Sequence, residues 1–171
     1  VMRTMLGLIE ATSGSSYILG RDSLNHNSAL MADIGYLPGA LAVYKNLTGR
    51  EYLKYISRLR KVNCDAEVDS LAARLKLDLD KHIHDLSKGN RQKVGVIQAF
   101  MHQPKVLILD EPTSGLDPLI QREFEKILDE VKARGAAVLL SSHVLSEVEH
   151  LADRIAVISE GKIVLNEEIS A

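Results

Sequence analysis

One uninterrupted apolar run constrains the fold of this chain more than any other feature. Residues 106–109 (VLIL) carry no polar side chain and are followed at once by two carboxylates. Such a run is typical of a parallel strand covered on both faces of its sheet. A helix is predicted after Asp117 and Pro118, ended by Gly135, with a second strand over 137–140. This β-α-β pattern predicts an α/β fold with a mostly parallel sheet.

The segments on either side differ in character. Two helices are predicted between Thr48 and Leu79, because Thr48 to Glu51 has the spacing of a capping box and Asp65 is expected to cap the second helix. The remaining elements expected are an apolar helix over 1–9, short strands over 16–19 and 34–37, and a closing hairpin over 155–165. We therefore expect a sheet core over 1–38 and 85–171, with an inserted helical lobe over about 39–84.

Composition narrows the class of protein. The 171 residues include 21 Lys or Arg and 23 Asp or Glu, for a net charge of −2. This balance argues against a sequence-independent nucleic-acid binder, which needs a basic face, so no nucleic-acid partner is expected. The only cysteine, Cys64, cannot form an internal disulfide, which fits a reducing compartment. No apolar run approaches the roughly 18 residues of a membrane span.

Polar residues follow both predicted parallel strands where each strand ends. Asp110 and Glu111 follow the first strand, and Ser141, Ser142 and His143 follow the second. If the strands share a sheet, these groups gather at its carboxyl edge, where open α/β sheets bind ligands. A carboxylate pair beside a histidine suits metal-assisted hydrolysis. The alternative is that Asp110 and Glu111 only end a strand, with His143 near a helix cap.

A helix start with surplus positive charge is the second candidate site. Ser87 is expected to cap a helix that runs to Met101, and its first turns carry Lys88, Arg91 and Lys93. Cations are disfavoured at this positive end of the helix dipole, by roughly 0.3–1 kcal/mol each. An anion such as phosphate would compensate them. The alternative is a solvated cationic face.

Four motifs, in order, carry a family resemblance. They are LSKGN (residues 86–90), VLILDEP (106–112), SGLD (114–117) and SSH (141–143). They resemble the signature motif, Walker B strand, D-loop and switch histidine of the nucleotide-binding domain of ATP-binding cassette (ABC) transporters. The match covers essentially the whole chain and is closest to ATPase subunits of drug, antibiotic or lipid exporters. It implies a P-loop NTPase-type fold.

The resemblance also implies roles for single residues. In the family, two such domains enclose two ATP molecules head to tail. Asp110 would hold Mg²⁺ through water, Glu111 would polarise the attacking water, and His143 would contact the γ-phosphate. Asp117 would link the two sites. The signature residues Ser87, Lys88, Gly89 and Asn90 would close on the ATP of the partner, which would be an identical or a different nucleotide-binding domain.

The chain departs from the family pattern in three places. The phosphate loop G-x-x-x-x-G-K-[ST] does not occur, and in the family it immediately precedes the helix expected at Val1. We therefore expect the 171 residues to be part of a longer subunit, inactive alone, with an unpaired edge on the strand 106–109. Gly39 stands where the family usually has a glutamine that contacts the metal and relays the nucleotide state to the membrane partner. Its absence puts this coupling in doubt. Lys88 and Asn90 replace the glycine and glutamine of the signature.

Three functions remain open. The leading hypothesis is an ATP-hydrolysing subunit that powers an exporter, bound to a membrane-spanning permease at the cytoplasmic face of the cell membrane. The second is an ABC ATPase outside transport, in DNA repair or on the ribosome. The third is an inactive cassette that acts by binding partners, which the missing phosphate loop favours and the presence of Asp110, Glu111 and His143 opposes.

Overall fold

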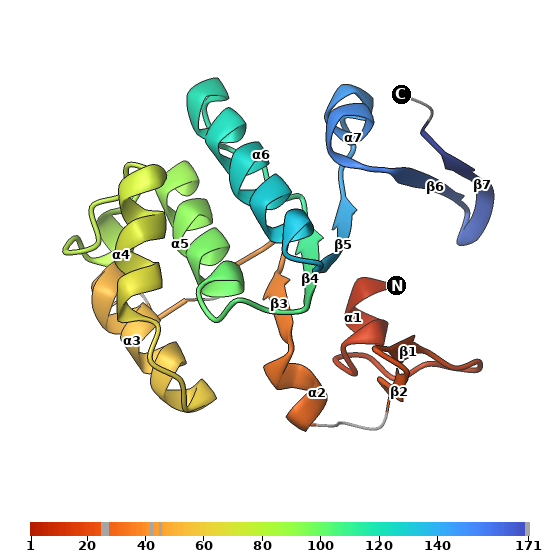
Figure 1. Ribbon diagram of the computed structural model, residues 1–171, viewed down its shortest axis with the longest axis horizontal. Coiled ribbons are helices and arrows are strands. Elements are labelled where there is room, and N and C mark those ends of the chain that lie inside the picture. The colour runs from red at the N-terminus through yellow and green to blue at the C-terminus, as the bar shows by residue number, and fades with distance from the viewer. Residues whose placement is uncertain (25–27, 42, 45, 170–171) are drawn as a thin grey trace. The chain divides into compact units, whose positions relative to one another are not determined.

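A three-stranded sheet lies at the centre of the first of two compact units, residues 1–140 (Figure 1). The computed structural model describes residues 1–24, 28–41, 43–44 and 46–169. The strands follow the order β3 (Ile34–Leu37), β4 (Val106–Asp110) and β5 (Ala137–Ser141), and β3 pairs with β4 in parallel. The Ala137 N–H donates to the Lys105 carbonyl at 2.9 Å, so β4 and β5 begin at the same end. The predicted parallel sheet is confirmed.

The position of β4 corrects one expectation. Because β4 lies between β3 and β5, residues 106–109 have no unpaired edge, and that prediction was wrong. The reason is the helix α6 (Pro118–Ala133), which carries the chain back so that β5 lies beside β4. Such short crossover connections return a parallel strand to the same sheet.

Helix α5 (Lys88–Phe100) covers one face of the sheet at unusually close range. An added Cβ atom at Gly35 in β3 would lie 2.1 Å from the Ala99 carbonyl oxygen of α5. An added Cβ at Gly95 in α5 would lie 2.6 Å from Leu37 Cδ1. Glycine at both positions therefore permits the helix to approach the strand.

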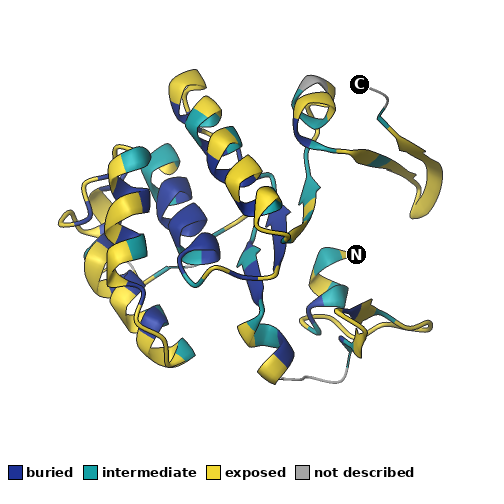
Figure 2. Ribbon diagram, viewed as in Figure 1, coloured by how far each residue is buried: buried dark blue, intermediate teal, exposed yellow. Residues whose placement is uncertain are grey.

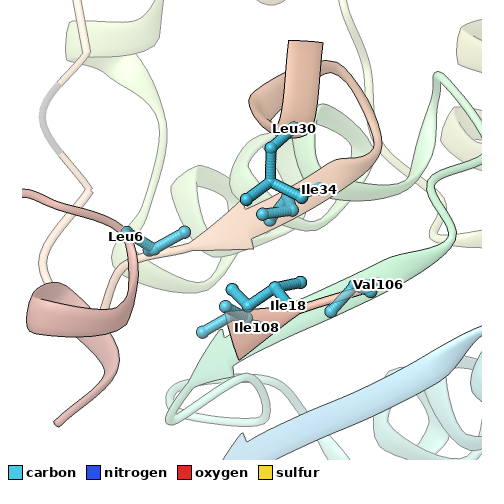
Figure 3. Close-up of a cluster of buried hydrophobic side chains, with 6 residues drawn as sticks. All are labelled: Leu6, Ile18, Leu30, Ile34, Val106 and Ile108. Atoms are coloured by element: carbon cyan, nitrogen blue, oxygen red, sulfur yellow. The ribbon is translucent and has the colours of Figure 1, made fainter. Parts of the chain in front are cut away.

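The opposite face of β3 and β4 is covered by the start of the chain. Ile34, Val106 and Ile108 pack against Leu6, Ile18 and Leu30, which follow or lie in α1 (Met2–Met5), β1 (Tyr17–Ile18) and α2 (Ser28–Ala32) (Figure 3). Residues 106–109 are all buried (Figure 2). The strand is thus covered on both faces, as its uninterrupted apolar run predicted.

Two predictions for the first 24 residues were incomplete. The opening helix ends at Met5 rather than Ile9, because Gly7 takes a φ of 66° and the Leu8 N–H donates to the Arg3 carbonyl at 2.9 Å. The predicted first strand is shorter, and it pairs with a strand that was not predicted, β2 (Arg21–Asp22).

The helices between β3 and β4 confirm most of what the sequence predicts for this segment. Helix α3 (Gly49–Arg60) begins at the predicted capping box. Helix α4 (Asp65–Arg74) has Cys64 at its N-cap, and Asp65 is its first helical residue rather than its cap. A short 3₁₀ helix, η1 (Ile83–Asp85), was not predicted. The division into a sheet core and a helical lobe stays a prediction.

Helix α6 follows the predicted pattern in full. Its apolar stripe is buried: Ile120, Phe124, Ile127, Leu128 and Val131. The Arg74 guanidinium of α4 reaches the carboxylates of Glu123 and Glu130 on α6, both at 2.7 Å. An aromatic contact joins α6 to α5, since the rings of Phe124 and Phe100 lie edge to face with centroids 6.0 Å apart.

The second unit spans residues 141–171, and its described part contains a helix and the closing hairpin. Helix α7 (Leu145–Leu151) precedes β6 (Arg154–Ser159), which pairs antiparallel with β7 (Lys162–Glu168). The predicted hairpin is confirmed and is longer at both ends. No helix in the described part of the chain has the length and apolar character needed to cross a membrane.

Candidate functional site

Two carboxylates stand at the end of the central strand. Asp110 is the last residue of β4, and Glu111 follows it in a left-handed backbone conformation with a φ of 51°. Both side chains are partly exposed. A non-glycine residue with positive φ is uncommon and is enriched at active sites. The strand therefore ends in a sharp turn that leaves both carboxylates within reach of solvent.

The loop after Glu111 leads to the predicted cap of α6. The Asp117 carboxylate accepts hydrogen bonds from the N–H groups of Leu119 and Ile120, both at 3.1 Å, and Pro118 takes the first helical position. Asp117 is exposed. Its structural role as N-cap is confirmed, and the same exposure leaves its carboxylate accessible to a partner.

The carboxylate of Asp110 lies against the backbone of Gly39. A Cβ atom added to Gly39 would lie 3.0 Å from Asp110 Oδ2. Burial, and then the negative charge of Asp110, raise the pKa of the Tyr36 hydroxyl in β3. The departure from the family pattern at position 39 is therefore in direct contact with the candidate metal ligand.

The start of α5 presents the second group of predicted residues. Ser87 caps the helix, since its Oγ accepts from the Asn90 N–H at 3.2 Å. Ser87 and Lys88 are exposed, and Gly89 and Asn90 are partly exposed. The four signature residues are thus accessible on the surface of this unit.

Lys93 differs from the expectation for this cationic helix start. Its side chain is buried, so it belongs neither to a solvated face nor to a surface that meets an anion. Burial lowers the pKa of its ammonium group, and the charge of Asp117 partly opposes that shift. Lys88 and Arg91 remain as the accessible cations of these turns.

The helix start and the loop after β4 are joined by direct contacts. Lys88 Nζ lies 3.5 Å from Ser114 Oγ. A Cβ on Gly89 would lie 2.3 Å from the Gly115 carbonyl oxygen. One turn further along α5, the Gln92 side-chain amide donates to the backbone carbonyls of Glu111 and Pro112, each at 3.1 Å.

Gln92 was not predicted as a site residue. The sequence signal for Gln92 was weak, because it is only a polar residue at the start of the mostly apolar stretch 92–97. In the structure, all six residues of this stretch are buried. A polar residue on a buried helix face needs a hydrogen-bond partner. The sequence therefore indicates that Gln92 has a hydrogen-bond partner, but the identity of that partner comes from the structure.

A hollow of about 700 Å³ opens beside the start of α5. Lys88, Arg91 and Gln92 line it from α5. The segment after β3 lines it with Gly39, Ala40, Leu41, Val43 and Tyr44. The described lining therefore combines an apolar wall with two cations.

His143 belongs to the second unit, in the turn between β5 and α7. The adjacent Ser142 hydroxyl accepts from the Val144 N–H and donates to Glu147, both at 3.0 Å, which orders this turn. His143 itself is exposed. Its expected position near Asp110 and Glu111 stays a prediction.

Comparison with known proteins decides the family. The ABC transporter family profile matches residues 1–114, about two thirds of the chain. The chain belongs to the ABC transporter family. The lantibiotic transport ATP-binding protein SrtF of Streptococcus pyogenes is 36% identical over 170 residues, which cover 98% of this chain and 72% of SrtF.

Other family members agree with this assignment. The bacitracin transport ATP-binding protein BcrA of Bacillus licheniformis is 36% identical over 166 residues, which cover 95% of this chain and 54% of BcrA. A solved ATP-binding subunit of an ABC transporter superposes with a TM-score of 0.89 at 28% identity, covering 98% of this chain and 72% of that one.

A more distant structure supports the fold alone. The ATP-binding cassette MJ0796, solved as a dimer with ADP and phosphate, has a TM-score of 0.87 at 18% identity and covers 99% of this chain. The α/β fold of ABC ATPases expected from the four motifs is confirmed. So is the function class: this ABC chain is of the ATPase subunit type that drives transport.

Proposed function

We propose that this chain forms part of the ATP-hydrolysing site of a subunit that powers export across a membrane, and that its contribution lies at the carboxyl end of β4. The observation that carries this proposal is the pair Asp110 and Glu111, partly exposed at the end of an otherwise buried central strand. Glu111 is placed to polarise the attacking water as general base. For His143 we propose the role that the family motif implies, contact with the γ-phosphate.

Asp110 fits the role of Mg²⁺ ligand. The part of the chain that the structure describes contains no cluster of three or more His, Cys, Asp or Glu that would form a metal site by itself. Mg²⁺ in phosphoryl transfer is usually bound by one or two carboxylates, water and the phosphates, so a single carboxylate at the strand end suffices. When bound, Mg²⁺ neutralises charge on the phosphates; Asp110 would hold it through water.

A second nucleotide-binding domain completes the site. Ser87, Lys88, Gly89 and Asn90 stand at an accessible helix start, and the positive end of a helix favours an anion. These residues close on ATP bound by the partner domain, and the exposed Asp117 contacts the partner between the two sites.

The transported compound belongs to the antibiotic class. SrtF is named for lantibiotic transport and BcrA for bacitracin transport, and both match nearly the whole chain. We therefore propose that the subunit acts at the cytoplasmic face of the cell membrane, bound to a membrane-spanning permease that exports a compound of this class.

The hollow beside α5 is the proposed contact for that permease. Its apolar wall, including Leu41 and Val43, and the cation Arg91 suit a segment with apolar and acidic side chains. The wall also begins at Gly39, whose backbone lies against Asp110. A segment bound here would therefore lie beside the metal ligand.

Replacing the general base tests the catalytic proposal. In the full-length protein, Glu111→Gln should retain ATP binding, trap the dimer and lose ATP hydrolysis by a factor of roughly 100 or more. Phosphate release, nucleotide binding and size-exclusion chromatography measure the three effects. The matched control is Glu125→Gln, which changes a partly exposed glutamate on α6 and should leave the rate of ATP hydrolysis unchanged. Undiminished turnover in Glu111→Gln would remove Glu111 as the base.

A charge placed in the hollow tests the permease contact. Leu41→Glu should release the membrane-spanning subunit that co-purifies with the wild-type protein, while ATP binding persists. Leu119→Glu, at an exposed position of α6, is the control and should still co-purify with the membrane-spanning subunit. Equal retention of the permease by both variants would contradict the proposed contact.

A further inference from the structure

The backbone of Glu111 depends on support from outside its own loop. Its φ of 51° lies in the left-handed region, which an L-residue with a Cβ atom rarely adopts. Within the loop, the Glu111 carbonyl accepts a hydrogen bond from the Ser114 N–H at 3.2 Å. Such conformations persist where the surrounding structure over-determines them.

Gln92 supplies that support from α5. Its Nε2 atom donates to the carbonyls of both Glu111 and Pro112 at 3.1 Å, so one amide uses its two hydrogens on consecutive backbone groups. The Gln92 side chain is 8% exposed, so water competes little for these carbonyls. Its own position is set by a helix whose next residues, 93–97, are buried.

We infer that Gln92 is a positioning residue for ATP hydrolysis: it holds the Glu111 backbone in the conformation that aims the carboxylate at the attacking water. This inference rests on the proposed role of Glu111 as general base. It also ties the base to the signature helix, because Gln92 lies five residues after Ser87 on the same helix. The two hydrogen bonds of the Gln92 amide therefore connect this helix to the backbone of Glu111 and Pro112.

The test replaces the amide by an apolar side chain of similar length. In the full-length protein, Gln92→Met should lower kcat for ATP hydrolysis roughly 10–100-fold, the range expected when a reacting group is displaced by about 1 Å. KM for ATP should change less than about twofold, because Gln92 contacts the loop and not the nucleotide. A merely structural role would lower thermal stability without this separation of kcat from KM.

Gln98→Met is the matched control on the same helix. Gln98 accepts a hydrogen bond from the Tyr52 hydroxyl, away from the loop, so its loss should reduce stability while kcat is retained. Gln92→Asn provides a second variant that keeps the polar group but shortens its reach by one methylene. Its kcat should fall as well, and the protein remains usable should Gln92→Met not fold.

A double-mutant cycle separates this inference from the proposed function. If Gln92 acts through Glu111, Gln92→Met should cause no further loss in the residual rate of Glu111→Gln. A further loss equal to that in the wild-type background would overturn the inference, as would wild-type kcat in Gln92→Met and Gln92→Asn while Glu111→Gln is inactive. Full activity in Glu111→Gln would instead overturn the proposed function.

Discussion

Gly89 lies so close to Gly115 that a Cβ atom on Gly89 would be 2.3 Å from the Gly115 carbonyl oxygen. Gly89 belongs to the first turn of α5, and Gly115, with a φ of 76°, belongs to the loop between Glu111 and Asp117. Two segments that are 26 residues apart therefore meet backbone to backbone. No side chain other than hydrogen fits between them at this distance.

Adding one methyl group at this contact should displace the loop. Gly89→Ala should lower stability by about 1–3 kcal/mol, the usual range for overpacking, and should also reduce ATP hydrolysis. Denaturant unfolding and phosphate release measure the two effects. Gly49→Ala is the comparison, because an added Cβ in the first turn of α3 would have its nearest neighbour at 3.3 Å and would need a shift of only a few tenths of an ångström, so a smaller loss of stability is expected. A Gly89→Ala variant as stable and active as wild type would contradict the contact.

The Ser87 hydroxyl should have two separable roles. Ser87→Ala removes the cap of α5 and should cost about 1 kcal/mol of stability. It should also weaken ATP-driven dimerisation, measured by analytical ultracentrifugation, if Ser87 contacts the partner's ATP. Thr48→Ala removes the cap of α3 and is the matched control. It should lose similar stability with unchanged dimerisation; an equal effect on dimerisation would assign Ser87 to capping alone.

The ion pairs between α4 and α6 should make stability depend on acid pH. The Arg74 guanidinium lowers the pKa of both Glu123 and Glu130. Carboxyls whose folded pKa is depressed stabilise the fold above their unfolded pKa, near 4.3, and lose that contribution as pH falls through the folded value. Arg74→Ala should therefore be less stable at pH 7 and lose less stability on acidification.

Thermal unfolding between pH 7 and pH 3 measures this effect. Arg50→Ala is the control, since Arg50 pairs with Asp69 and Asp80 through side chains that are largely exposed. Exposed pairs of this kind contribute little. If Arg74→Ala kept the acid dependence of the wild type, the ion pairs with Glu123 and Glu130 would not be its cause.

His102 should produce a second pH dependence at milder acidity. Burial, together with the nearby Arg60 charge, lowers the pKa of His102 to about 4. The ring Nε2 contacts the Ile34 carbonyl at 3.1 Å, and Nδ1 is buried without a hydrogen-bond partner among the residues that the structure describes. Between about pH 6.5 and 4, the histidine is protonated in the unfolded chain and neutral in the folded protein. The free energy of unfolding should therefore decrease as the pH is lowered from about 6.5 to 4.

Removing the titrating ring should flatten that dependence. His102→Gln keeps a donor for the Ile34 carbonyl, and its stability should vary less between pH 6.5 and 4, by on the order of 2 kcal/mol. His82→Gln, at an exposed position, is the control. The comparison is made by urea unfolding at several pH values, and equal slopes for His102→Gln and wild type would exclude His102 as the source.

Local features of the chain predicted most elements of the fold. The capping box at Thr48, the Asp117-Pro118 helix start and the run 106–109 each depend on residues a few positions apart, and all three are confirmed. The errors arose where the determinant is not local. The neighbour of β4 is set by the return of the chain through α6, which the run 106–109 does not encode.

The candidate site divides in the same way. Asp110, Glu111 and Ser87 could be singled out from the sequence, because strand ends and helix starts are visible as changes in polarity and in capping chemistry. Lys93 was misplaced and Gln92 was missed. For both, burial in the folded chain was decisive, and Gln92 is buried where its amide reaches a loop about twenty residues away.

The sequence by itself determined the family, the α/β class and the chemical groups at the end of the central strand, because these depend on residue types in a fixed order. Only the tertiary structure decided that α5 is held against the loop 111–117 by Gln92 and by the contact of Gly89 with Gly115. The reason is physical: a backbone carbonyl accepts a hydrogen bond from any suitably placed donor. Which donor reaches it depends on how the elements pack.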